Sequence, residues 1–371
     1  KNGYKQTTIP DEVIQKLLKI NTLNYEYCFE FMKRLLLILC SRINCKHTWI
    51  QIKKKYVKKC RMFLKKETDS TYYILNLIGN SFISNDKKIE IIYDNQELTG
   101  LWIDDSKHFS LSIDQFNSGK LIMGFGPSAS GKTHWAKSII KLLSKYTDMN
   151  FPTNFLSIDG GIQRETSFIY QIIKNMIKEY EGFGIKNLMS GSLTLPSIFS
   201  SNKIKKILKE YLKIQSLIGI HPNLYIPETL GGCSLTYDCS NKYKEYIKIT
   251  NDTDWIGLYI WQHKDHCPLS EEYKCKTTIK SGSEREINEG KKYNPNAYSI
   301  SEVHGNRQLF KDNRYKIRIH NSGGLIHHKS IIELDEELML KIYNNKDYIE
   351  KEFNSVFIPF KTEFNNSNPV F

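Results

Sequence analysis

The chain has 371 residues, of which 40% are hydrophobic and 25% are charged. This composition is that of a globular protein with two or three domains, and it excludes collagen-like, wholly disordered and membrane-embedded classes. The 53 lysines and arginines outnumber the 40 aspartates and glutamates, so the net charge is +13. Such a charge favours acidic partners, nucleic acid among them.

No segment has the length of a membrane span. The longest apolar run is Leu35–Cys40, flanked by Arg34 and Arg42, whereas a spanning helix needs about twenty apolar residues. The eight cysteines include no C-x-x-C pair, which is typical of reduced thiols in a cytosolic protein rather than of a disulfide scaffold. We therefore expect a cytoplasmic protein without a membrane span.

Residues 1–85 are predicted to form a mainly helical N-terminal domain. The segment Pro10-Asp11-Glu12 is typical of a helix start, and apolar residues then recur at helical spacing. Within this domain, Lys53–Lys66 contains eight basic residues and no acidic one. Two interpretations remain open: a phosphate-binding face for nucleic acid or another acidic partner, or the solvated side of an amphipathic helix.

Residues 86–117 are predicted to be a small β element and connector, because 89–93 and 98–103 read as the two strands of a hairpin. From residue 118 to 330, strands alternate with helices, which predicts an α/β P-loop kinase core with a mostly parallel, five-stranded sheet covered by helices. The predicted strands cover residues 120–125, 155–158, 224–226, 255–261 and 315–319. Residues 331–371 are predicted to add a C-terminal helix and tail.

The first predicted strand runs directly into a phosphate-binding loop of the pattern G-x-x-x-x-G-K-T. Its residues are Gly126, Pro127, Ser128, Ala129, Ser130, Gly131, Lys132 and Thr133. Glycines allow backbone N–H groups to face phosphate oxygens, and the helix that follows adds its positive N-terminal end. Lys132 is expected to contact the β- and γ-phosphates, and the Thr133 hydroxyl to ligate Mg²⁺. The chain lacks the N-K-x-D motif of GTPases and the hydrophobic run ending in Asp-Glu of ATPase motors.

Asp159 ends the second predicted strand and is followed by two glycines and by Gln163-Arg164-Glu165. Ligands bind at the carboxyl ends of strands in sheets of this type. A carboxylate at that position accepts the proton of an attacking hydroxyl, and we expect Arg164 and Glu165 to hold the acceptor. The alternative interpretation is that Asp159 only caps the following helix.

Glu228 and Thr229 end the third predicted strand. This position suits a carboxylate that holds a Mg²⁺-bound water, or a pair of polar side chains that hold a substrate hydroxyl. We therefore include Glu228 among the metal and substrate residues and Thr229 among the substrate residues. The alternative is an ordinary polar turn.

Two further positions complete the candidate site. Arg285 lies in the polar stretch 264–295, where a lid would be expected, and a lid arginine stabilises charge on a transferring phosphoryl group. Asn321 follows the fifth predicted strand, close to where the adenine ring of a nucleotide would lie. A solvated charged loop and a polar turn, respectively, are the alternative interpretations.

With these residues together, the region from about 118 to 325 resembles the zeta-toxin family of P-loop kinases. The similarity lies in the phosphate loop, Asp159, Glu228-Thr229, the basic lid and Asn321-Ser322-Gly323. The resemblance implies a kinase that uses ATP or GTP with Mg²⁺ to phosphorylate a hydroxyl of a UDP-sugar. It also implies that Lys132 and Thr133 contact nucleotide and metal, that Asp159 is the base and that Arg285 belongs to a lid. An effector of this kind would act after delivery into a host cytoplasm.

The sequence therefore predicts an ATP- and Mg²⁺-dependent phosphotransferase. Its γ-phosphate acceptor would be a hydroxyl of a small phosphorylated molecule or a nucleotide sugar. Two alternatives remain open. One is a polynucleotide 5′-hydroxyl kinase, favoured by the net charge and by Lys53–Lys66. The other is a nucleotide-gated module whose N-terminal domain binds a protein or an acidic membrane.

Overall fold

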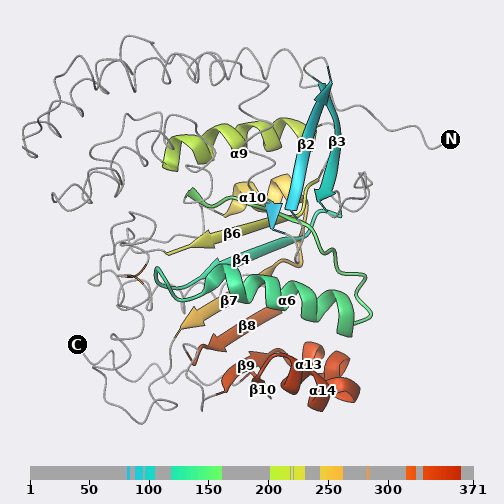
Figure 1. Cartoon of the computed structure of the whole chain (residues 1–371), viewed down its shortest axis with the longest axis vertical. Coiled ribbons are helices and arrows are strands. Elements are labelled where there is room, and N and C mark those ends of the chain that lie inside the picture. Colours follow the sequence, from blue (N-terminus) through green and yellow to red (C-terminus); the bar gives the residue numbers. More distant parts are fainter. Residues whose placement is uncertain are drawn as a thin grey trace, which may run out of the picture. The chain divides into compact units, whose positions relative to one another are not determined.

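Figure 1 shows the computed structural model of the chain, which divides into two compact units. The first unit comprises Lys1–Ser118, Asn154–Asn223 and Gly282–Tyr293, and the second comprises Gly119–Thr153, Leu224–Ser281 and Asn294–Phe371. The structure describes residues 82–83, 88–94, 97–104, 118–160, 201–217, 219, 221–229, 243–261, 282, 284, 315–322 and 329–360.

The first unit contains the predicted hairpin. Strands β2 (Lys88–Asp94) and β3 (Glu97–Asp104) pair antiparallel, with a register shift between Ile92 and Tyr93. A second antiparallel pair joins the short β1 (Phe82–Ile83) to β5 (Phe155–Ser157). Apart from β1, the predicted N-terminal helical domain and the basic run Lys53–Lys66 lie outside the described residues.

Helix α9 (Ser201–Leu217) also belongs to the first unit, and it buries Leu208 and Leu212 at the i, i+4 spacing expected of an amphipathic helix. The fully buried Asn223 links three parts of this unit. Its backbone O accepts a hydrogen bond from the N–H of Leu156 at 2.8 Å, its Nδ2 donates to the O of Asn154 at 3.2 Å, and its Oδ1 accepts from the Ser118 hydroxyl at 2.6 Å. The backbone and side chain of Asn223 together therefore hold the start of β5 in place.

The second unit is built on a mostly parallel sheet with the strand order β6-β4-β7-β8-β9-β10. The pairs β4–β6, β4–β7, β7–β8 and β9–β10 are parallel, and β8–β9 is antiparallel. The strands are β4 (Leu121–Phe125), β6 (Leu224–Glu228), β7 (Ile256–Trp261), β8 (Tyr315–His320), β9 (Ser330–Leu334) and β10 (Ser355–Pro359). The fold is therefore mixed α/β, as predicted.

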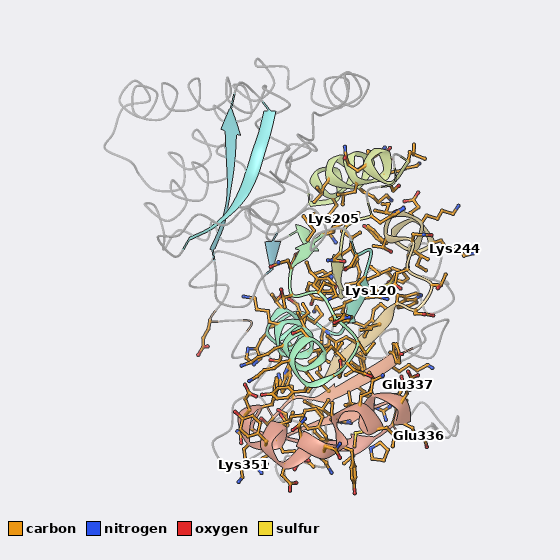
Figure 2. The ribbon with its side chains drawn as sticks, turned by 90° about the vertical axis from the view of Figure 1, so that its right-hand side faces the viewer. Lys120, Lys205, Lys244, Glu336, Glu337 and Lys351 are labelled. Atoms are coloured by element: carbon orange, nitrogen blue, oxygen red, sulfur yellow. The ribbon has the colours of Figure 1, made fainter. Side chains whose placement is uncertain are left out.

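The central strand β4 is buried on both faces. Leu121, Ile122, Met123 and Phe125 are each at most 1% exposed, and burial of such side chains contributes about 1.5–3 kcal/mol each. Helix α6 (Lys132–Tyr146) covers one face of the sheet, and α10 (Lys244–Thr250) lies on the other, with Lys244 projecting outward (Figures 1 and 2). Continuous apolar strands between two helical layers are typical of a parallel sheet. None of the described helices is both long and apolar enough to cross a membrane.

The C-terminal segment differs from the predicted helix and tail. It contains β9, α13 (Glu336–Ile342), a 3-10 turn η5 (Tyr343–Asn345), α14 (Lys346–Glu352) and β10. The first turn of α13 holds Glu336 and Glu337 (Figure 2), and acidic side chains are favourable at this end of the helix dipole. The two strands, each five residues long, were not predicted as strands. The sheet therefore has more strands than the five predicted, and the predicted boundary at residue 330 falls within β9.

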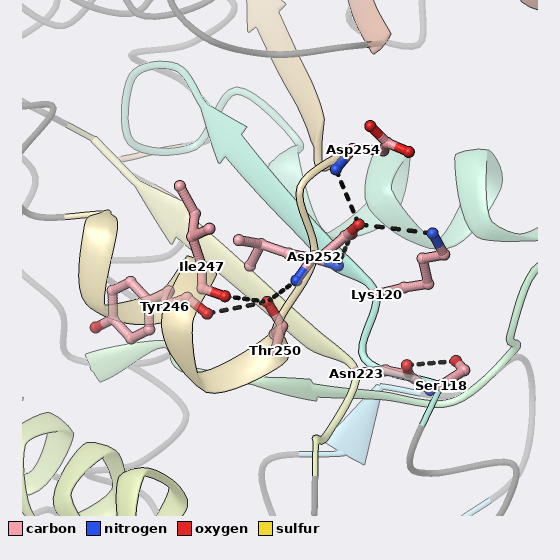
Figure 3. Close-up of polar contacts among 9 residues, drawn as sticks. Ser118, Lys120, Asn223, Tyr246, Ile247, Thr250, Asp252 and Asp254 are labelled. Carbon is pink, nitrogen blue, oxygen red and sulfur yellow. Dashed lines mark hydrogen bonds and ion pairs between the residues drawn. The ribbon is translucent and has the colours of Figure 1, made fainter. Parts of the chain in front are cut away.

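Asp252 anchors the start of β4. Its Oδ2 accepts a hydrogen bond from the Leu121 N–H at 2.9 Å, and its Oδ1 accepts one from the Asp254 N–H at 3.1 Å (Figure 3). Lys120 Nζ lies 3.5 Å from the same Oδ1, and the Asp252 side chain is only 5% exposed. These contacts tie the segment before β7 to the start of the strand that leads into the phosphate loop.

We expect Asp252→Ala to lower the free energy of unfolding by about 1–3 kcal/mol, because the buried N–H of Leu121 loses its acceptor. A matched control is Asp148→Ala, whose side chain is 80% exposed and pairs with Lys341 at 2.8 Å. A surface pair of this kind contributes about 0–1 kcal/mol. Urea denaturation measures both variants, and equal losses would contradict an anchoring role for Asp252.

Candidate functional site

The phosphate loop connects β4 to α6, and three of its residues have a positive φ. Gly126 has φ 142°, Ala129 65° and Gly131 88°. At Gly126 a side chain is also excluded by space, since a Cβ there would lie 2.3 Å from the backbone O of Ile260 on β7. The first glycine of the motif is therefore required both by its backbone conformation and by the close approach of β7.

Lys132 folds its side chain back over the loop. Its Nζ donates hydrogen bonds to the backbone O of Gly126 at 2.8 Å and of Pro127 at 2.6 Å. The ammonium group is thereby held over the loop, at the N-terminal end of α6. A cation in this place faces whatever anion the loop binds.

The N-terminus of α6 has the properties of an anion site. The N-cap is Gly131, which makes no side-chain capping bond, and the first turn contains no acidic residue. The N–H groups of this turn and the positive end of the helix dipole therefore point toward the loop without a competing carboxylate. Thr133, in the same turn, is half-buried, which places a hydroxyl beside this positive end.

Asn321 contacts the phosphate loop itself. Its Nδ2 donates a hydrogen bond to the backbone O of Ser130 at 3.0 Å, although the two residues are 191 positions apart. A Cβ on Gly131 would lie 3.2 Å from this Nδ2, so the second glycine allows the approach of the amide. The sequence interpretation placed Asn321 near a nucleotide base. The geometry adds a contact that holds the loop backbone.

Glu228 lies on the strand next to the loop. It ends β6 and pairs in register with Phe125, the last residue of β4, so its half-buried carboxylate stands beside the start of the phosphate loop. Tyr243 directly precedes α10 and Tyr246 lies on it. Burial raises the pKa of both phenols, and the negative charge of Glu228 raises it further. Thr229, the next residue, is exposed.

The residues around the loop fit a Mg²⁺ ion that takes some of its ligands from water and phosphate better than a metal ion held by protein side chains alone. Thr133 offers a hydroxyl and Glu228 a carboxylate, and oxygen ligands of this kind suit Mg²⁺, which keeps several waters and takes other ligands from phosphates. Among the described residues there is no group of three or more His, Cys, Asp or Glu side chains that could hold a metal ion.

The phosphate loop belongs to the second unit, whereas Asp159 follows β5 in the first unit, where it is half-buried. Arg164, Glu165 and Arg285 lie outside the described residues. Their roles remain predictions.

Sequence reasoning missed one buried residue and one cluster. Tyr243 is 3% exposed, and its hydroxyl has no hydrogen-bond partner within the described part of the chain; a tyrosine in a polar segment gave no signal. The cluster consists of Arg318, His320 and Glu333, which meet between β8 and β9. Alternation along residues 315–320 would have revealed that Lys316, Arg318 and His320 share one strand face.

No protein-family model matches this chain, and no curated protein sequence matches it. Among solved structures, one similar chain comes from a characterisation of the PezAT chromosomal toxin–antitoxin system of Streptococcus pneumoniae. The identity is 16% and the TM-score 0.34, over 56% of this chain and 71% of that chain.

Proposed function

We propose that this protein is a nucleoside triphosphate-dependent phosphotransferase that uses Mg²⁺. One observation carries the proposal: a G-x-x-x-x-G-K-T loop joins a buried parallel strand to an uncapped, acid-free helix, with the lysine held over the loop. This arrangement offers backbone N–H groups, a helix dipole and an ammonium group to the same anion. Polyphosphate is the ligand that matches this combination.

In the proposed reaction, Lys132 neutralises charge on the β- and γ-phosphates and orients them. Thr133 and Glu228 would hold Mg²⁺, directly or through water, and the ion when bound stabilises charge on the phosphate oxygens. Asp159 would accept the proton of the attacking hydroxyl, and Arg285 would close over the transferring group. ATP is the proposed donor, with GTP as an alternative.

The proposed acceptor is a hydroxyl of a small phosphorylated molecule or a nucleotide sugar. Its support is the resemblance of Asp159, Glu228 and Thr229 to the zeta-toxin kinase pattern, together with the net charge of +13. Arg164 and Glu165, just after Asp159, would bind its polar groups. A basic protein attracts a doubly charged acceptor before any specific contact forms.

The variant Asp159→Asn tests the base. We expect it to bind ATP as tightly as the wild type and to transfer phosphate about 10²–10⁴-fold more slowly, because the amide does not accept a proton. The assay follows label from γ-labelled ATP into UDP-sugars, nucleosides and 5′-hydroxyl oligonucleotides, with Asp148→Asn as the matched exposed control. Undiminished transfer by Asp159→Asn would remove this carboxylate from the mechanism.

The same panel separates the two alternatives. Transfer to oligonucleotides, with binding that weakens steeply between low and moderate salt, would identify a polynucleotide kinase. Tight ATP binding without transfer to any acceptor would instead support a nucleotide-gated interaction module.

A further inference from the structure

A buried cluster of charged side chains lies between β8 and β9. Arg318 donates from Nε to Glu333 Oε2 at 2.8 Å and also pairs with it through a second guanidinium nitrogen, and His320 Nε2 lies 2.7 Å from Glu333 Oε1. These three side chains are 5–7% exposed. The ring of Phe360 covers the guanidinium group, with its centroid 4.9 Å from Arg318 Cζ.

Pairing two strands through buried charged groups carries a large desolvation penalty. Each buried charge loses its hydration, and apolar residues of similar volume often give equal or greater stability. Burial alone would raise the pKa of Glu333, but its bonds with His320 and the positive charge of Arg318 outweigh this and hold the pKa below its usual value. Glu333 is therefore ionised, and its two oxygens fix both partners in defined positions.

The cluster stands next to the residue that contacts the phosphate loop. Arg318 lies near the end of β8, His320 is its last residue, and Asn321 follows directly. On the other side of Asn321, the Ser322 N–H donates to Ser330 Oγ at 3.0 Å, and Ser330 Oγ donates to Ser322 Oγ at 3.2 Å. Side chains of β9 thus hold the chain on both sides of Asn321.

We propose that Arg318, His320 and Glu333 are positioning residues for nucleotide binding. They fix the end of β8, so that Asn321 engages the carbonyl of Ser130 and keeps that oxygen turned away from the bound phosphates. A loop held in this form binds without the cost of ordering it. The inference rests on the proposed function, because it assumes that the loop binds a nucleotide. It also assigns a role to β9, which supplies Glu333 to the site.

A double-mutant cycle tests this role. Glu333→Gln, Asn321→Ala and the double variant are compared with the wild type by calorimetric titration with a non-hydrolysable ATP analogue and Mg²⁺. Each single variant should raise Kd about five- to tenfold, the effect of one hydrogen bond. The Kd of the double variant should not exceed that of the single variant with the higher Kd, because the cluster acts through Asn321. A merely structural role would not produce this coupling.

The matched control is Glu352→Gln. Glu352 lies on the same C-terminal segment as Glu333, and its carboxylate pairs with Lys141 at 2.8 Å. Its Kd should equal that of the wild type. If Glu333→Gln does not fold, Arg318→Met combined with Glu333→Leu removes both charges while usually preserving stability, and the same rise in Kd is expected.

Three results would overturn the inference. These are an unchanged Kd in a folded cluster variant, single effects that multiply in the double variant, and a Kd for Glu352→Gln that rises as much as that for Glu333→Gln. A wild type that does not bind the ATP analogue would overturn the proposed function as well, so the two failures are distinguishable.

Discussion

Replacement of Lys132 by alanine is expected to lower kcat/KM for phosphate transfer about 10²–10³-fold. The ammonium group is held over the loop by the carbonyls of Gly126 and Pro127, in the place where it meets the charge of the transferring group. Loss of one such donor costs catalysis this much in comparable sites. Steady-state transfer of label from γ-labelled ATP to the best acceptor measures the effect.

The control is Lys137→Ala, an exposed lysine on the same helix. It removes the same charge from α6 without touching the loop, so its kcat/KM should remain within about twofold of the wild type. Thermal unfolding of both variants separates a catalytic loss from a folding defect. Similar losses in the two variants would show that only the net charge of the helix matters.

The variant Gly126→Ala is expected to lower the free energy of unfolding by about 2–4 kcal/mol and to abolish nucleotide binding. Its Cβ would lie 2.3 Å from the backbone O of Ile260 at a φ of 142°, so either β7 or the loop must move. Denaturation in urea gives the first effect, and calorimetric titration with the ATP analogue gives the second.

Gly219→Ala is the matched control for this variant. Gly219 also has a positive φ, 82°, but no atom lies within 4 Å of the added Cβ. Only the cost of the left-handed conformation remains, about 1–2 kcal/mol. If the two variants were equally destabilised, the contact with Ile260 would not contribute, and the loop would have to be more adaptable than its geometry indicates.

Much of the core could be predicted from local patterns. The phosphate loop is a contiguous motif, and the following helix buries Trp135, Ile139 and Leu143, which recur at helical spacing. Hydrophobic periodicity and glycine-rich turns act over a few residues, so they are present in the sequence itself. The predicted strands of the α/β core were confirmed for the same reason.

The C-terminal strands were harder to predict. Residues 330–334 carry an acidic side chain at Glu333, which argues against a buried strand when the partner is unknown. On β8, Arg318 pairs with that carboxylate and His320 Nε2 lies within hydrogen-bond distance of it, so the buried charge has partners. A charge can be buried only where its partner is in reach, and this depends on strand order.

The chain's local sequence determined an α/β core and a phosphate-binding loop with its lysine and threonine. It also placed two carboxylates, Asp159 and Glu228, at strand ends. Tertiary structure decided which distant residues meet that loop: Asn321 on Ser130, Glu228 beside Phe125, and Glu333 between Arg318 and His320. The physical reason is the range of the forces involved. Backbone conformation and periodicity are properties of neighbouring residues, whereas hydrogen bonds and ion pairs between strands exist only after the sheet has set its order and register.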